Sequence, residues 1–220
     1  MSSLVTKLLF PPKCRFCRKL LTDDQTDLCH RCRCDTPDFI RSKRNFQLVA
    51  QWTAVWYYKD DVRNSIRRFK FYDARGYARF FAQEMAMKLQ DAPFEKGADL
   101  ITWVPISVRR DMERGYNQAE LLAVALSEEL GIPAVRCLRK LYHTKPQSSF
   151  SSYASRRANV FNAYEGVESQ RFSGKRVLLV DDVITTGSTA TECAKALMLS
   201  GAKSVYFAAI AAAVNEKTSR

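Results

Sequence analysis

Two adjacent acids followed by a hydroxyl-rich turn are the feature of this sequence with the clearest chemistry. Residues 177–189 are V-L-L-V-D-D-V-I-T-T-G-S-T, and an alanine-rich run follows at 190–199. The four apolar residues predict a strand buried on both faces, and the alanine-rich run predicts a helix. Asp181 and Asp182 would therefore lie where a strand ends, beside a turn that opens a helix.

This arrangement favours a phosphorylated sugar as ligand. A helix N-terminus offers unpaired N–H groups and the positive end of the helix dipole, and both attract phosphate. Gly187 lets the backbone approach a ligand, and hydroxyl donors come from Thr185, Thr186, Ser188 and Thr189. Two carboxylates beside such a turn can bind sugar hydroxyls, or a Mg²⁺ ion that carries a pyrophosphate. The turn has neither the G-x-x-x-x-G-K-S/T pattern nor a lysine, so it is not a Walker loop. The simpler alternative is a strand–turn–helix whose Thr and Ser residues only cap the helix.

The elements around the acids predict an α/β fold. Strands are expected at residues 99–105, 132–138 and 204–213, with a helix at 119–130. This alternation predicts a mainly parallel sheet with helices on both faces. Ligands of such sheets bind beyond the carboxyl ends of the strands, where the acid pair is expected.

The preceding segment predicts a linker, a strand and two helices. Residues 35–47 are polar and indicate a linker, 48–59 a first strand, and 61–90 two helices with a break at Gly76. In the first helix Phe69 and Phe71 are candidates to face inward, and the basic residues are expected to face outward. The residues expected to be buried in the second helix are Phe80, Phe81, Met85 and Leu89.

Further cations lie where they could meet a pyrophosphate. Arg110 and Arg114, followed by Asn117, precede the helix at 119–130. Residues 139–159 form a long polar segment, and loops of this length in a compact domain are usually functional or disordered. Its Lys145 and Arg156 would suit a lid over an anionic ligand.

Paired cysteines near the start of the chain predict a structural zinc site. Cys14-x-x-Cys17 and Cys29-x-x-Cys32 are separated by eleven residues. Under reducing conditions such pairs predict a tetrahedral site with four cysteine ligands. Alternatives are Cys34 in place of Cys32, a contribution from His30, and free or disulfide-bonded thiols. We expect a zinc module at residues 1–45, stabilised by its metal, and a larger domain at 46–220.

The charge of the chain indicates polyanionic partners. The sequence has 35 Lys and Arg residues against 23 Asp and Glu, a net charge of +12. Aromatic residues alternate with bases between residues 67 and 79, where Arg67, Arg68, Lys70 and Arg75 are candidate contacts to single-stranded DNA. The alternative is an amphipathic helix with buried aromatics and solvated arginines. No apolar run reaches about 18 residues and the N-terminus is a poor signal peptide, so we expect a cytoplasmic protein without a membrane span.

Taken together, these segments resemble the ComF family. The resemblance rests on the cysteine pairs, V-P at 104–105, R-G-Y-N-Q at 114–118, the R-K…T-K…Q…R-x-x-N-V pattern across 139–160, and V-D-D-V-I-T-T-G-S-T. It implies a type I phosphoribosyltransferase domain with a small zinc module, and a role in handling single-stranded DNA during bacterial competence. It further implies that Asp181 and Asp182 hold the ribose of phosphoribosyl pyrophosphate (PRPP), that residues 185–189 hold its 5′-phosphate, and that Mg²⁺ accompanies it. Competence proteins such as a helicase are implied partners.

Two classes of function remain open on this basis. The first is a PRPP-binding protein that handles single-stranded DNA during DNA uptake. The second is an active phosphoribosyltransferase acting on a base or an amine. Amidophosphoribosyltransferases use an N-terminal cysteine to release ammonia from glutamine, whereas this chain begins Met1-Ser2-Ser3, so we expect no glutaminase half.

Overall fold

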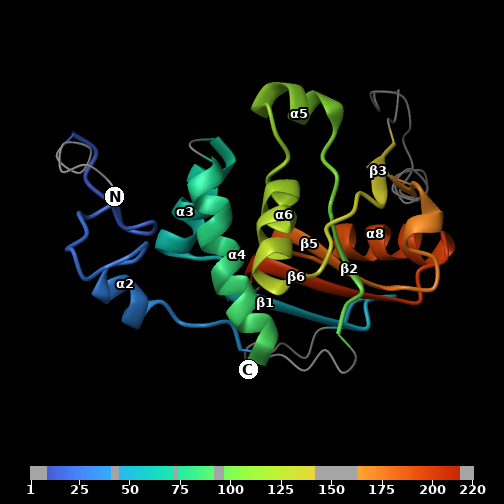
Figure 1. Cartoon of the computed structure of the whole chain (residues 1–220), viewed down its shortest axis with the longest axis horizontal. Coiled ribbons are helices and arrows are strands. Elements are labelled where there is room, and N and C mark those ends of the chain that lie inside the picture. Colours follow the sequence, from blue (N-terminus) through green and yellow to red (C-terminus); the bar gives the residue numbers. More distant parts are fainter. Residues whose placement is uncertain (1–8, 41–44, 72–73, 92–96, 142–162, 214–220) are drawn as a thin grey trace, which may run out of the picture.

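The core of the protein is a four-stranded sheet in which all neighbouring strands are parallel. A computed structural model describes residues 9–40, 45–71, 74–91, 97–141 and 163–213. The strand order is β1 (Gln51–Tyr57), β6 (Ser204–Ala212), β5 (Arg176–Ile184) and β2 (Leu100–Trp103) (Figure 1). The predicted parallel sheet is confirmed, with the acid-bearing strand near its centre.

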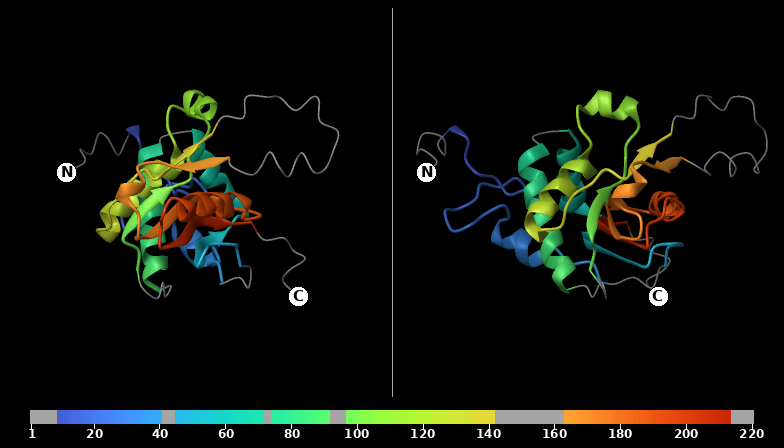
Figure 2. Two further views of the ribbon diagram at one scale, coloured as in Figure 1. Left: turned by 90° about the vertical axis from the view of Figure 1, so that its right-hand side faces the viewer. Right: turned by 45° about the vertical axis from the view of Figure 1, so that its right-hand side comes forward.

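Helices cover both faces of this sheet, as predicted. On one face α3 (Asp60–Phe71), α4 (Ala74–Asp91) and α6 (Gln118–Leu130) pack in one hydrophobic cluster with Leu178 and Val180. On the other face α8 (Ser188–Leu199) packs in a second cluster with Val177 and Leu179 (Figure 2). This division follows from the alternation of side chains along β5, because successive residues of a strand point to opposite faces.

The predicted strand at residues 132–138 is wrong. Ala134 forms only an isolated bridge to Ile101, although Val135 N–H also donates to the Ile101 carbonyl. Pro133 has no N–H to extend that pairing into a ladder. The chain instead enters β3 (Leu138–Lys140), which pairs antiparallel with β4 (Tyr164–Gly166) over α8.

Three smaller expectations also need correction. A short helix, α5 (Val108–Arg114), lies between the strand expected at 99–105 and the helix expected at 119–130, where no helix was predicted, and it stands apart from the sheet (Figures 1 and 2). The break between α3 and α4 comes before Gly76, which lies inside α4. Phe71 is exposed at the end of α3 rather than buried, whereas the four apolar residues expected to be buried in α4 are buried.

The segment predicted as a linker packs against the edge strand β1. Asp38 bridges Trp56 in antiparallel fashion, and the Phe39 N–H donates to the Val55 carbonyl at 2.7 Å. Phe39 and Phe46 are both buried, and both rings contact the indole of Trp52. Because β1 is at the edge of the sheet, this segment covers backbone groups that would otherwise be unpaired.

An ion pair fastens β2 to β5 at their amino ends. The Arg176 backbone N–H donates to Asp99 at 2.8 Å, and its guanidinium Nε donates to the same carboxylate oxygen at 3.0 Å. These hydrogen bonds lower the pKa of Asp99 to about 2. In the part of the chain that the structure describes, no helix has both the length and the apolar character needed to cross a membrane.

Candidate functional site

The acid pair lies in the carboxyl-terminal half of β5. Asp181 pairs with Ala209 of β6, but β2 ends at Trp103, opposite Val180. The strand continues to Ile184, so the acids belong to the strand rather than following it. On the β2 side they have no strand neighbour, because β2 ends before them.

The two carboxylates occupy successive positions of β5, and their charges interact. Asp181 Oδ1 accepts the backbone N–H of Asp182 at 2.8 Å. Burial, followed by the charge of Asp182, raises the pKa of Asp181 to about 8, and the ammonium groups of Lys70 and Lys140 oppose this rise. Burial and mutual repulsion thus disfavour two negative charges here, and an additional cation or hydrogen-bond donor would stabilise the ionised pair.

A lysine that was expected to face outward reaches this pair. Lys70 Nζ lies 2.9 Å from Asp182 Oδ2, with both side chains largely buried. Helical periodicity places Lys70 on the polar side of α3, but that side faces the carboxyl end of the sheet here. Sequence reasoning missed this contact because it joins residues from two elements that lie 112 positions apart (182 − 70).

The turn after β5 has the predicted form and opens α8. Gly187 is the N-cap residue, with φ +81°. A β-carbon at this position would collide with the ring of Phe46. Both the positive φ and this close contact therefore require glycine. The hydroxyls of Thr186 and Ser188 lie 2.9 Å apart, while Thr185, Thr186, Ser188 and Thr189 are all exposed to solvent. This turn presents hydroxyl groups and a helix N-terminus to the same side as the acid pair.

The R-G-Y-N-Q segment ties elements of the site together. Asn117 caps α6, since its Oδ1 accepts the Ala119 N–H at 3.0 Å, while its Nδ2 donates to the Val104 carbonyl at 3.1 Å. The Tyr116 hydroxyl donates to the Phe69 carbonyl at 2.9 Å, and the Gln118 amide donates to the Lys70 carbonyl at 3.4 Å. The Asn117 side chain is thus engaged structurally, and its predicted contact to pyrophosphate stays a prediction.

The structure does not describe the side chains of several residues that were predicted to contact a ligand. Arg110 and Arg114 belong to α5 and Arg75 to α4, but the described part of the chain does not include their side chains. Lys145 and Arg156 lie outside the described residues. Their proposed contacts to pyrophosphate or DNA therefore stay predictions.

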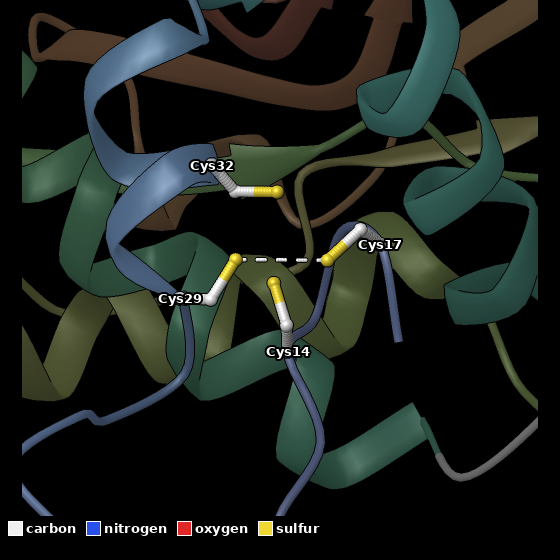
Figure 3. Close-up of side chains that lie close together, drawn as sticks. All are labelled: Cys14, Cys17, Cys29 and Cys32. Carbon is white, nitrogen blue, oxygen red and sulfur yellow. Dashed lines mark hydrogen bonds between the residues drawn. The ribbon is translucent and has the colours of Figure 1, made fainter. Parts of the chain in front are cut away.

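Four cysteine thiols converge at the N-terminal module (Figure 3). The sulfur atoms of Cys14, Cys17, Cys29 and Cys32 all lie within 4.8 Å of one another. A zinc–sulfur distance of about 2.3 Å puts tetrahedral ligands about 3.8 Å apart, so the cluster fits zinc. Burial opposes ionisation of Cys17, but the Lys19 N–H and the neighbouring thiols outweigh it and lower its pKa to about 7. The cluster thus combines the donor set and the spacing of a closed structural site.

The alternatives for the cysteines are not supported. All seven are free thiols, so none forms a disulfide. Cys34 is exposed, and its sulfur lies 3.8 Å from a ring nitrogen of His30 rather than within the cluster. Cys32 instead lies on α2 (His30–Asp35) with its thiol facing the other three (Figure 3).

The cysteine module shares a hydrophobic core with the larger domain. Phe16, between the first two cysteines, is buried and packs edge-on against Trp56 and Phe80, with ring centres 5.1 and 5.8 Å away. Arg33 also pairs with Glu84 of α4 at 2.6 Å. The proposed boundary near residue 45 therefore separates segments of the chain that fold against each other.

The basic and aromatic run on α3 and α4 is mostly engaged within the protein. Arg67 is exposed as predicted, but Arg68 donates to the Tyr77 hydroxyl at 3.1 Å and to two backbone carbonyls. Phe69 and Tyr77 are buried. The expected outward direction of Arg68 and Lys70 is thus wrong, and the amphipathic-helix alternative accounts for the buried aromatics. Their proposed contact to DNA is untested.

Comparisons with known proteins identify relatives of this chain. The chain is 36% identical over 156 residues to Competence protein F of Haemophilus influenzae, covering 69% of this chain and 68% of that protein. It is 30% identical over 200 residues to DNA utilization protein YhgH of Escherichia coli O157:H7, covering 87% and 86%. A solved amidotransferase from B. subtilis, glutamine phosphoribosylpyrophosphate amidotransferase, is 26% identical over 59% of this chain and 25% of its own, with a TM-score of 0.41.

The family assignment follows from the sequence relatives. Residues 117–220, which include the acid pair, the hydroxyl turn and α8, match the phosphoribosyl transferase domain family. The match to Competence protein F, at 36% identity over more than two thirds of both chains, shows which family the whole chain belongs to. The chain therefore belongs to the ComF family and contains a phosphoribosyl transferase domain.

Proposed function

We propose that this protein binds PRPP together with Mg²⁺ where β5 meets α8, and that it handles single-stranded DNA during DNA uptake. The observation that supports the ligand best is the partly buried acid pair at the carboxyl end of β5, adjoining a hydroxyl-lined turn at a helix N-terminus. The names of its relatives, a competence protein and a DNA utilization protein, support the DNA role.

The chemistry of the site matches the parts of PRPP. Asp181 and Asp182 would accept hydrogen bonds from the two ribose hydroxyls. Residues 185–189 would hold the 5′-phosphate through hydroxyl and backbone N–H donors. Magnesium would neutralise the pyrophosphate and add the cation that the paired carboxylates favour. The ligand would lie beside β5 beyond the end of β2, where the acids have no strand neighbour.

Calorimetry with Mg²⁺ and PRPP tests this assignment. Changing both Asp181 and Asp182 to Asn should weaken binding at least tenfold, because even one charge-assisted hydrogen bond, such as that of Asp182, contributes roughly 1.5–3 kcal/mol. A matched control changes Asp23 and Asp24 to Asn, since this second adjacent acid pair is exposed in the cysteine module. Equal affinity of wild type and the Asp181/Asp182 variant would remove the acid pair from the binding site.

Phosphoribosyl transfer is a second candidate function, favoured by the domain match at residues 117–220. Transfer would release pyrophosphate as an amine or base takes the C1 position of the ribose. Incubating the protein with Mg²⁺, PRPP and candidate acceptors and measuring pyrophosphate distinguishes the two functions. Acceptor-dependent release supports an enzyme, whereas binding with no release above the protein-free rate supports a ligand-responsive DNA-handling protein.

The DNA role predicts affinity that depends strongly on salt. For single-stranded DNA, log affinity falls linearly with log salt concentration. The slope becomes shallower by about 0.7 for each phosphate contact that is removed. Arg67 and Arg79 are exposed members of the basic run, so changing both to Gln should flatten the slope by about 1.4. Lys175→Gln with Lys203→Gln is the matched control, because both lysines are exposed near the amino end of the sheet. A fluorescent oligonucleotide that fails to bind at low salt would end the DNA hypothesis.

We also propose that the four clustered cysteines hold one structural zinc ion. The reducing cytoplasm, where we place the protein, keeps such thiols available for metal. A closed set of four thiolates leaves no position for a reacting water, so this metal would stabilise the module rather than catalyse. Its removal should therefore loosen the packing of Phe16 against Trp56 and Phe80.

A further inference from the structure

The last turn of α3 joins the cysteine module to the acid pair. Three consecutive residues form this connection, namely Arg68, Phe69 and Lys70. Arg68 contacts the module, Phe69 is fully buried in the core, and Lys70 pairs with Asp182.

Arg68 is hydrogen-bonded to the cysteine knuckle itself. Its guanidinium donates to the carbonyl of Arg15 at 2.9 Å and to the carbonyl of Phe16. These two carbonyls belong to the residues between Cys14 and Cys17, so their positions depend on the conformation of the metal-binding loop. The Tyr77 hydroxyl accepts a third hydrogen bond, from Arg68 Nε. A planar guanidinium with several fixed donors holds such a site more firmly than an ammonium group would.

Lys70 occupies one oxygen of the Asp182 carboxylate. An ionised carboxylate has two oxygens with about four acceptor positions. The ammonium can therefore stay on Oδ2 while a ligand hydroxyl donates to the rest of the group. By balancing one negative charge and fixing the carboxylate orientation, Lys70 prepares Asp182 for a hydroxyl ligand.

The end of α3 has little freedom to move independently of these contacts. Its free carbonyls at Phe69 and Lys70 accept hydrogen bonds from Tyr116 and Gln118. Arg68 and Lys70 are two residues apart in the same helical turn, so displacement of one carries the other along.

We propose that Lys70 is a positioning residue of the ligand site, and that the cysteine module holds it beside Asp182 through Arg68. The proposal rests on the proposed function only for the identity of the ligand as PRPP. It follows that metal in the cysteine module and ligand at the acid pair strengthen each other's binding, because such coupling is reciprocal.

A double-mutant cycle tests the connection by calorimetry with Mg²⁺ and PRPP. Arg68→Gln and Lys70→Met should each weaken binding by about tenfold. The double variant should be little weaker than either single variant, because both changes remove the same support from Asp182. Lys70→Arg should recover part of the affinity, since it keeps the positive charge. Arg63→Gln is the control, because Arg63 is exposed on the same helix and should leave affinity unchanged.

A second readout does not depend on PRPP. The backbone amide NMR signals of residues 181–189 should shift in Arg68→Gln and on chelation of the metal, but not in Arg63→Gln. Thermal unfolding of each variant checks that it remains folded.

The two readouts separate the possible failures. If wild type binds PRPP and Arg68→Gln binds it equally well, the connection is overturned. The connection is also overturned if the affinity losses of Arg68→Gln and Lys70→Met add strictly in the double variant. Amide shifts in Arg68→Gln without PRPP binding by any variant, wild type included, would support the connection and reject PRPP as the ligand. Unaltered amide signals in Arg68→Gln would overturn the proposal whatever the ligand.

Discussion

Replacing Gly187 with alanine should destabilise the protein for two separable reasons. The residue has φ +81°, and a residue with a β-carbon costs roughly 1–2 kcal/mol in this left-handed conformation. The added β-carbon also collides with the buried ring of Phe46, and overpacking of this kind costs roughly 1–3 kcal/mol. The free energy of unfolding should therefore fall by about 2–5 kcal/mol, the sum of the two costs.

Urea unfolding separates the two costs when a second glycine is compared. Gly174 has a similar φ of +71°, but a β-carbon there would meet no atom within 4 Å. Gly174→Ala should lose only the conformational part, about 1–2 kcal/mol. In a Phe46→Ala background, Gly187→Ala should likewise cost only about 1–2 kcal/mol, because the ring that it strikes is gone.

Two results would refute this reasoning. If Gly187→Ala and Gly174→Ala destabilise the protein equally, the contact with Phe46 contributes nothing. If the changes at positions 46 and 187 are additive, the two residues are not coupled through that contact. Either result would show that the ring of Phe46 does not restrict the residue at position 187.

Three further changes test the metal site and the ionised groups. We expect metal analysis of wild type to give about one zinc per chain; changing both Cys14 and Cys29 to Ser should abolish it, whereas Cys34→Ser, at an exposed thiol outside the cluster, should retain it. The pKa of Asp181 is about 8 in the folded state and near 3.8 in the unfolded state, so between these values only the folded state keeps the proton. The stabilisation that this proton gives the folded state is complete below pH 3.8 and is lost as pH rises towards about 8. Urea unfolding of Asp181→Asn should therefore show a flatter dependence on pH over that window than wild type. For Asp99 the pKa is lowered to about 2 by Arg176, so its stabilisation is present above pH 3.8 and is lost as pH falls towards 2. Asp99→Asn should unfold more easily than wild type at neutral pH, by a modest amount because the pair is partly exposed, and the difference should vanish near pH 2.

Features set by neighbouring residues could be predicted from the sequence. The apolar run before the acids, Gly187 and the alanine-rich run each favour one local structure, so β5, the turn and α8 were predicted with small errors at their ends. The two C-x-x-C pairs likewise bring thiols together through local spacing. In both cases the chemistry depends on residues close in the chain, which a sequence pattern can show.

Features set by contacts between distant segments were missed. Helical periodicity correctly makes Lys70 a polar-face residue, but it contains no information on which element that face meets. Phe46 and Phe39 stand among polar residues, and composition alone assigned them to a linker although both are buried against β1. Pro133 was an available signal against the strand at 132–138, since proline cannot donate within a ladder.

The R-G-Y-N-Q segment also has a structural role that the sequence did not indicate. Its position before α6 favoured a direct contact with pyrophosphate. In the structure Tyr116 and Gln118 hold the end of α3, and Asn117 joins α6 to the end of β2, while the contact with pyrophosphate stays a prediction. An acid pair in a buried position costs stability unless a cation compensates it, and Lys70 is compensating only while the end of α3 is held in place. Tyr116 and Gln118 of the motif therefore hold the end of α3 on one side and the cysteine module holds it on the other, so loss of either support should reduce ligand binding.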